Sequence, residues 1–203
     1  MLDRPESASL IGMNGLYALK PWYADRLSGL RRGLIRHHVS PNILTVTGVG
    51  FGAAAGVAIA LIPAGPIAGL SVAALLAARL GCANLDGAVA RETGASSRFG
   101  FVTNELGDRL AEFAALAGVL ALAAPGWVAL AALAGTLPSW VALAGTAAGA
   151  TRVQGGPVGK TERAALLVVL AATGWTLPIL ALYSAGSLVT AVVRAARVHR
   201  TLS

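Results

Sequence analysis

Long runs without charged residues dominate the chain after its first forty positions. No Asp, Glu, Lys, Arg or His occurs in 39–78, 113–151 or 164–193. Each run exceeds the ~20 apolar residues that cross a bilayer once. Pro and Gly residues interrupt the runs near their middles, at 63–66, 124–126 and 174–178, and such clusters end helices. We therefore predict an all-α integral membrane protein with three helical hairpins, six transmembrane helices in all. The shortest run completes its hairpin only by taking residues from its charged flanks.

The basic residues fall on one side of this predicted layout. All 16 Lys and Arg residues lie in 4–36, 79–109, 152–163 or 194–200, and the turns at 63–66, 124–127 and 174–178 contain none. Cytoplasmic loops carry an excess of Lys and Arg, so both termini are predicted to lie in the cytosol. The net charge of +7 is then interpreted as a basic rim facing anionic lipid head groups, and no nucleic acid is expected as a partner.

The segment before the first apolar run has a separate character. Residues 16–36 mix apolar and basic side chains, and Leu27, Leu30 and Leu34 recur at helical spacing. This pattern is typical of an amphipathic helix lying in the membrane interface, with a solvated basic tail as the alternative. Residues 1–39 are therefore assigned to a cytosolic N-terminal segment and 40–203 to the six-helix domain. Met1 to Glu6 is polar, so no signal peptide is expected.

Acidic residues at the edges of apolar helices are the candidates for chemistry, because such charges are costly in a membrane. Asp86 lies near the end of the second predicted helix, and Asn104, Asp108 and Glu112 lie on one face of the third at spacings of four. The short connector between these helices allows Asp86 to face Asn104 and Asp108. Converging carboxylates at a membrane surface suit a divalent cation such as Mg²⁺.

Ion pairing is the alternative explanation for the same acidic residues. Glu105 and Arg109 are four apart on the third predicted helix, which predicts an ion pair between them. Asp86 and Asp108 would then only balance the charges of Arg91 and Arg109 at the helix ends.

The spacing of these residues resembles the signature of the CDP-alcohol phosphotransferase family, D-x2-D-G-x2-A-R-x8-G-x3-D-x3-D. The positions that match are Asp86, Gly87, Ala90, Arg91, Gly100 and Asp108, and the segment 40–45, Ser-Pro-Asn-Ile-Leu-Thr, also resembles the start of the first crossing in that family. The resemblance covers about 16 to 200. Two positions depart from it, since Ala83 and Asn104 stand where the signature has aspartate.

The resemblance implies a phosphatidyltransferase of phospholipid biosynthesis in a bacterial inner membrane, with a cytosolic site and a homodimeric assembly. In the family an alcohol or phospho-alcohol attacks the lipid-side phosphorus of a CDP-diacylglycerol-type lipid and CMP leaves, with Mg²⁺ or Mn²⁺ as cofactor. Carried over by position, Asp108 is the catalytic base, and the metal ligands are Asp86, Asn104 and Asp108, with Glu105 as a further candidate. The CDP moiety is assigned to Gly87, Ala90, Arg91 and Gly100, and an acceptor phosphate to Lys160 and Arg163.

The two departures leave more than one function open. Alanine ligates nothing and an asparagine carbonyl is neutral, so the implied metal site lacks two negative charges unless Asn84, Glu105 or Glu112 compensates. One alternative is a family member that binds a CDP-lipid or a partner without turnover. Another is a small transporter, although the acidic residues lie near one surface and no inverted repeat is visible.

Overall fold

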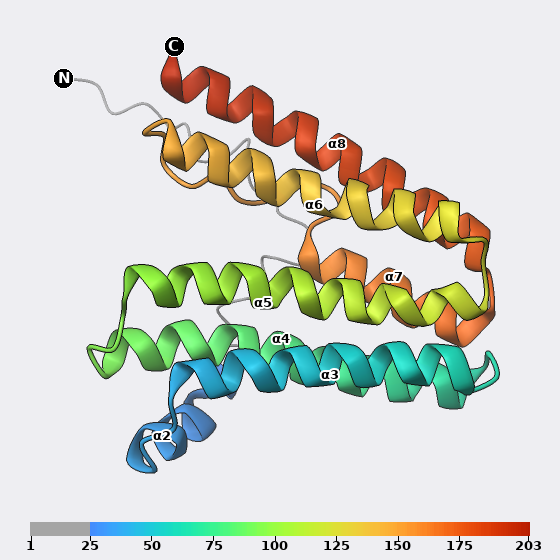
Figure 1. Cartoon of the computed structure of the whole chain (residues 1–203), viewed down its shortest axis with the longest axis horizontal. Helices are drawn as coiled ribbons and strands as arrows, with labels where there is room; N and C mark the ends of the chain where they lie inside the picture. The colour runs from blue at the N-terminus through green and yellow to red at the C-terminus, as the bar shows by residue number, and fades with distance from the viewer. Residues whose placement is uncertain (1–24) are drawn as a thin grey trace.

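The structure is a computed structural model that describes residues 25–203. Seven α-helices and one 3₁₀ helix make up this part of the chain, which contains no β-strand (Figure 1). The helices are α2 (Ser28–Arg36), α3 (Pro41–Leu61), α4 (Pro66–Glu92), α5 (Arg98–Ala117), η3 (Gly118–Ala121), α6 (Pro125–Ala147), α7 (Lys160–Thr173) and α8 (Thr176–Leu202). The predicted all-α class is confirmed.

The three predicted turns lie together at one end of the bundle, on the right in Figure 1, where α3 meets α4, η3 meets α6 and α7 meets α8. Pro66 and Pro125 are the first residues of α4 and α6, a position that needs no backbone N–H donor. Gly174 ends α7 in the left-handed conformation, with φ 73°, which glycine adopts without a Cβ clash. The turn residues therefore act as the sequence predicts.

Four helices of the described chain are long and apolar enough to cross a membrane, namely α3, α4, α6 and α8. The chain is therefore an integral membrane protein with helical spans. The other two helices of the predicted six differ from these in composition or length. Five charged residues lie on α5, and the 14 residues of α7 extend about 21 Å at 1.5 Å per residue, less than the ~30 Å bilayer core.

Glycines on α3 bring it unusually close to α5. A Cβ on Gly52 would lie 2.4 Å from the Ala111 carbonyl oxygen, and one on Gly56 would lie 2.2 Å from that of Ala114. Only residues without a side chain permit two helix backbones to approach this closely. The contact fixes α3 against α5 and so places Thr45, near the start of α3, beside the acidic end of α4.

The helix α2 packs its leucine face on the end of the bundle opposite the three turns, on the left in Figure 1. Leu27 and Leu34 contact a buried cluster formed by Leu44, Leu85 and Val89, whereas Leu30 is 55% exposed. The expected amphipathic helix is therefore present over Ser28–Arg36. Its predicted beginning, 16–24, lies outside the described residues, and its position in the membrane interface stays a prediction.

Candidate functional site

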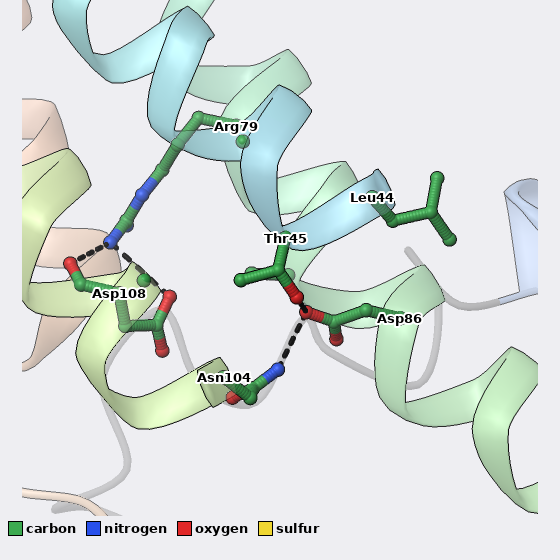
Figure 2. Close-up of a pocket in the computed structure, with 9 residues that line it drawn as sticks. Leu44, Thr45, Arg79, Asp86, Asn104 and Asp108 are labelled. Carbon is green, nitrogen blue, oxygen red and sulfur yellow. Dashed lines mark hydrogen bonds and ion pairs between the residues drawn. The ribbon is translucent and has the colours of Figure 1, made fainter. Parts of the chain in front are cut away.

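Asp86 lies at the centre of a small polar cluster that joins three helices (Figure 2). Its Oδ2 accepts hydrogen bonds from Thr45 Oγ1 of α3 at 3.0 Å and from Asn104 Nδ2 of α5 at 2.6 Å. Its Oδ1 accepts the backbone N–H of Gly87 at 2.5 Å. Asp86 is only 4% exposed. The three hydrogen-bond donors offset the cost of burying its carboxylate. The predicted approach of Asp86 to Asn104 is confirmed.

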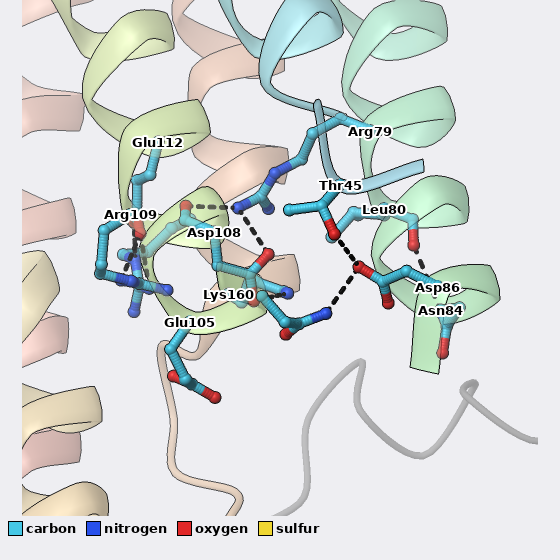
Figure 3. A network of polar contacts seen from close by, with 12 residues as sticks. Thr45, Arg79, Leu80, Asn84, Asp86, Glu105, Asp108, Arg109, Glu112 and Lys160 are labelled. Carbon is cyan, nitrogen blue, oxygen red and sulfur yellow. Dashed lines mark hydrogen bonds and ion pairs between the residues drawn. The ribbon is translucent and has the colours of Figure 1, made fainter. Parts of the chain in front are cut away.

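Asp108 lies one turn after Asn104 on α5, and two cations contact it (Figure 3). Arg79 Nη2 donates to the Asp108 carbonyl oxygen at 2.9 Å and lies 3.4 Å from Oδ1. Lys160 Nζ, at the first residue of α7, donates to Oδ2 at 2.5 Å. The Arg79 side chain is only 5% exposed, whereas that of Lys160 is 31% exposed. The cluster therefore has one buried and one accessible cation.

A cavity of about 10 Å³ lies between these groups and is lined by Thr45, Arg79, Ala83, Asp86 and Asp108 among others. A space of this size holds about one water molecule. Lys160 lines a neighbouring cavity of about 20 Å³, which shares Arg79 with the first one.

A second ionic cluster lies deeper along α5 and includes the predicted face residue Glu112. Glu112 accepts hydrogen bonds from Arg163 of α7, with Nη2 at 3.2 Å and Nε closer, and from Tyr183 Oη of α8 at 2.5 Å. Arg163 and Tyr183 are almost fully buried. This network joins α5, α7 and α8. Arg163, which the resemblance assigns to an acceptor phosphate, is paired with Glu112 in it.

The expected ion pair between Glu105 and Arg109 is wrong. Arg109 Nη1 instead pairs with Glu112 at 2.5 Å, because Arg109 points into the bundle where Glu112 is buried. Glu105 pairs with Arg152 of the α6–α7 connection, whose guanidinium also stacks on Phe101 at 5.3 Å. Glu105 therefore does not join Asp86 and Asp108, and the alternative in which Asp108 balances only Arg109 misses its contacts with Arg79 and Lys160.

The residues assigned to the CDP moiety lie at the facing ends of α4 and α5. Gly87, Ala90 and Gly100 are half-buried and Arg91 is exposed. A Cβ on Gly87 would lie 3.2 Å from Arg91 Nη1, so the guanidinium folds back over this glycine. The Gly100 N–H donates to Ser97 Oγ at 2.9 Å, which caps the start of α5. Their contact with a nucleotide stays a prediction.

Two residues of the cluster were not selected from the sequence. Thr45 belongs to the 40–45 segment, but nothing in the sequence pairs it with Asp86. Arg79 is a single charge within the apolar part of α4, and a buried charge in a membrane helix requires a partner. That requirement was the available signal for Arg79.

The arrangement of these donors does not fit a divalent cation. Among residues 25–203, no group of three or more His, Cys, Asp or Glu side chains is placed to hold a metal ion. Both oxygens of Asp108 face cations, Asn104 turns its amide nitrogen to Asp86, and Asn84 donates to the Leu80 carbonyl. Like unit charges 4 Å apart repel by about 4 kcal/mol at an effective dielectric constant near 20, and a divalent ion doubles that repulsion.

Comparisons with known proteins agree with the motif and the fold. The family model for CDP-alcohol phosphatidyltransferase matches residues 38–197. A comparison with curated proteins gives no match. The fold resembles that of phosphatidylinositol phosphate synthase (PgsA1) from Mycobacterium tuberculosis with CDP-DAG bound, with a TM-score of 0.65 and 23% identity over 84% of this chain and 92% of that one.

A second structure of the same synthase, in complex with manganese and citrate, gives a TM-score of 0.66 at 23% identity and covers 85% of this chain and 88% of that one. The apo form gives a TM-score of 0.60 at 23% identity, over 86% and 95% of the two chains. At this identity the likeness shows the fold alone. The family match spans most of the sequence, and the chain belongs to the CDP-alcohol phosphatidyltransferase family.

Proposed function

We propose that this protein transfers a phosphatidyl group from a CDP-diacylglycerol-type lipid to an alcohol or phospho-alcohol, releasing CMP. The observation that carries the proposal is the convergence of Asp86 and Asp108, the two retained motif aspartates, on one cavity beside Lys160. Family membership identifies the reaction class. CDP-DAG bound to the structurally similar synthase supports the choice of lipid.

The site supplies a base and positive charge for this reaction. The acceptor oxygen forms a bond to the lipid-side phosphorus while the bond between that phosphorus and the oxygen of CMP breaks, and the electron pair leaves with CMP. Asp108 is placed to accept the proton of the acceptor hydroxyl. Arg79 and Lys160 are placed to stabilise negative charge on the phosphates. Asp108 is free to act as a base once a phosphate takes over its contact with Lys160.

The placement in the membrane is part of the same proposal. We assign α3 to α8 to six crossings, and both termini to the cytosol of a bacterial inner membrane. Lys160 and the connections rich in Arg then lie on the cytosolic side, where CDP-lipids and soluble acceptors meet. A homodimer, as the family implies, is proposed for the assembly.

The test is release of CMP from CDP-diacylglycerol by the purified protein in lipid nanodiscs, with a panel of alcohols and phospho-alcohols. We expect release that depends on one acceptor and falls by about a hundredfold or more in Asp108→Asn, which loses the base. Glu105→Gln is the matched control, since Glu105 pairs with Arg152 away from the cavity. Release that persists undiminished in Asp108→Asn contradicts the assigned base.

Binding of a CDP-lipid without turnover is the second candidate. It is favoured by the pairing of Asp108 with both Arg79 and Lys160, because a carboxylate held by two cations is a poor proton acceptor. Saturable lipid binding with no CMP release across the acceptor panel would select this candidate.

The two motif departures lead to a further prediction. Ala83 lines the cavity, and Asn104 already contacts Asp86. Changing Ala83→Asp together with Asn104→Asp adds two carboxylates to the cluster, and oxygen-rich acidic sites bind Mg²⁺ and Mn²⁺. We expect Mn²⁺ binding by the double variant to be at least about tenfold tighter than by the unchanged protein, measured by electron paramagnetic resonance. No gain would contradict the assignment of these two positions to the motif.

A further inference from the structure

We propose that Arg79 and Lys160 take the place of a divalent cation at this site, so that the protein holds the diphosphate of its lipid without a metal ion. The identity of the lipid rests on the proposed function. The role of the two cations rests on contacts within the described chain.

Arg79 is built into the site as a fixed charge. It lies one helical turn before Ala83 on α4, its side chain is 5% exposed, and it lines the same cavity as Asp86 and Asp108. Arg79 contacts Asp108 through one guanidinium nitrogen, Nη2. A guanidinium has five N–H donors in a planar fork that suits phosphate oxygens, so the geometry allows it to serve Asp108 and a ligand together.

Lys160 is the movable counterpart of Arg79. It begins α7 after the α6–α7 connection, and its ammonium reaches Asp108 Oδ2 while its side chain remains 31% exposed. Lysine carries a compact charge on a flexible stem. A short movement of the Lys160 side chain can therefore transfer its ammonium from Asp108 to an entering phosphate, and this frees Oδ2 of Asp108.

The charges of the cluster already balance. Asp86 and Asp108 contribute two negative charges, and Arg79 and Lys160 contribute two positive charges in direct contact with Asp108. Because both cations contact Asp108, a divalent cation can reach this carboxylate only by displacing them. A diphosphate can instead bind the two cations themselves, through charge-assisted hydrogen bonds.

The experiment measures equilibrium binding of CDP-diacylglycerol to the full chain in nanodiscs, in EDTA and then in excess Mg²⁺. We expect the two dissociation constants to agree within about twofold. Addition of Mn²⁺ without lipid is expected to give no protein-bound signal by electron paramagnetic resonance. Binding that disappears in EDTA, or Mn²⁺ bound at the protein site, overturns the metal-free inference and leaves the proposed function intact.

Variants of Lys160 separate its charge from its packing. In EDTA, Lys160→Gln is expected to weaken lipid binding by about tenfold or more, because a hydrogen bond to a charged group is lost. Lys160→Arg keeps the charge and is expected to retain most of the affinity. Arg200→Gln, at an exposed position in the last turn of α8, controls for general attraction of anionic lipid.

The outcomes of these variants are distinct from failure of the proposed function. Equal affinity in the unchanged protein and Lys160→Gln, with both folded by circular dichroism, contradicts a role for this cation. No binding of CDP-diacylglycerol in either EDTA or Mg²⁺ instead overturns the proposed lipid, and with it the ligand assigned to Arg79 and Lys160.

Discussion

Replacing Glu112 by alanine is expected to lower the stability of the protein by about 3–5 kcal/mol, the usual cost of removing one partner from a buried ion pair. Glu112 is the anion shared by Arg163, Arg109 and the hydroxyl of Tyr183. Arg163 is 3% exposed, so Glu112→Ala leaves a guanidinium inside the bundle without its counter-ion. The thermal midpoint in detergent should fall by about 10 °C or more.

The matched control is Glu105→Ala, which also removes a glutamate of α5 from an ion pair. The Arg152 side chain on that pair is 36% exposed, and exposed ion pairs contribute only about 0–1 kcal/mol. Changing Arg163→Met together with Glu112→Gln should recover part of the stability, because the more deeply buried charge, that of Arg163, is then removed and only Arg109 has lost its partner. Equal midpoints for Glu112→Ala and Glu105→Ala would show that the buried network does not stabilise the fold.

Adding one methyl group at Gly118 is expected to be nearly as harmful. A Cβ there would lie 1.9 Å from the carbonyl oxygen of Gly56 and 2.7 Å from its Cα. The obstruction is backbone, which cannot rotate away, so α3 and η3 must separate. We expect Gly118→Ala to lower the free energy of unfolding, measured in mixed micelles, by about 3 kcal/mol or more.

Gly50→Ala provides the same substitution without the clash. Gly50 is exposed on α3, and a Cβ built there meets nothing within 4 Å. Alanine in a helix interior is favoured over glycine by roughly 0.5–1 kcal/mol, so this variant should be neutral or slightly stabilised. If Gly118→Ala is as stable as Gly50→Ala, α3 and η3 do not approach as closely as the structure indicates.

Much of the fold was predictable because local signals determine it. The charge-free runs and the Pro/Gly clusters predict the α3–α4, η3–α6 and α7–α8 turns, and helix caps and φ preferences act over only a few residues. The length of α7 was harder to predict. Its apolar run begins only at Ala164, after the polar residues that start the helix. The connection before α7 depends on Gly155 and Gly156, which adopt positive φ, and Arg194 of α8 donates to the Gly155 carbonyl.

The candidate site was predictable where one helix or one short connector sets the geometry. The four-residue spacing on α5 and the brief α4–α5 connection are enough to bring Asn104 to Asp86. The cations were not predictable in the same way. Arg79 reaches Asp108 across 29 positions of sequence and Lys160 across 52, and such contacts depend on how α4, α5 and α7 pack.

The missed ion pairs have the same physical origin. Glu105 and Arg109 have the right helical spacing, but spacing gives only a few tenths of a kcal/mol to a pair. Buried partners decide the outcome, since Arg109 turns to Glu112 and Glu105 turns to Arg152. The close packing of Gly52 and Gly56 on α5 was likewise encoded in a four-residue repeat of small residues, a signal that becomes specific only once the facing helix is known.

The most direct test of the proposed function is lipid mass spectrometry after incubation of the protein with CDP-diacylglycerol and the acceptor panel in liposomes. We predict a new lipid whose mass equals the phosphatidyl group joined to one acceptor, formed together with CMP and missing when Asp108→Asn protein is used. CDP-diacylglycerol that remains unconverted with every acceptor, although the protein is folded and binds it, would contradict phosphatidyl transfer as the function of this chain.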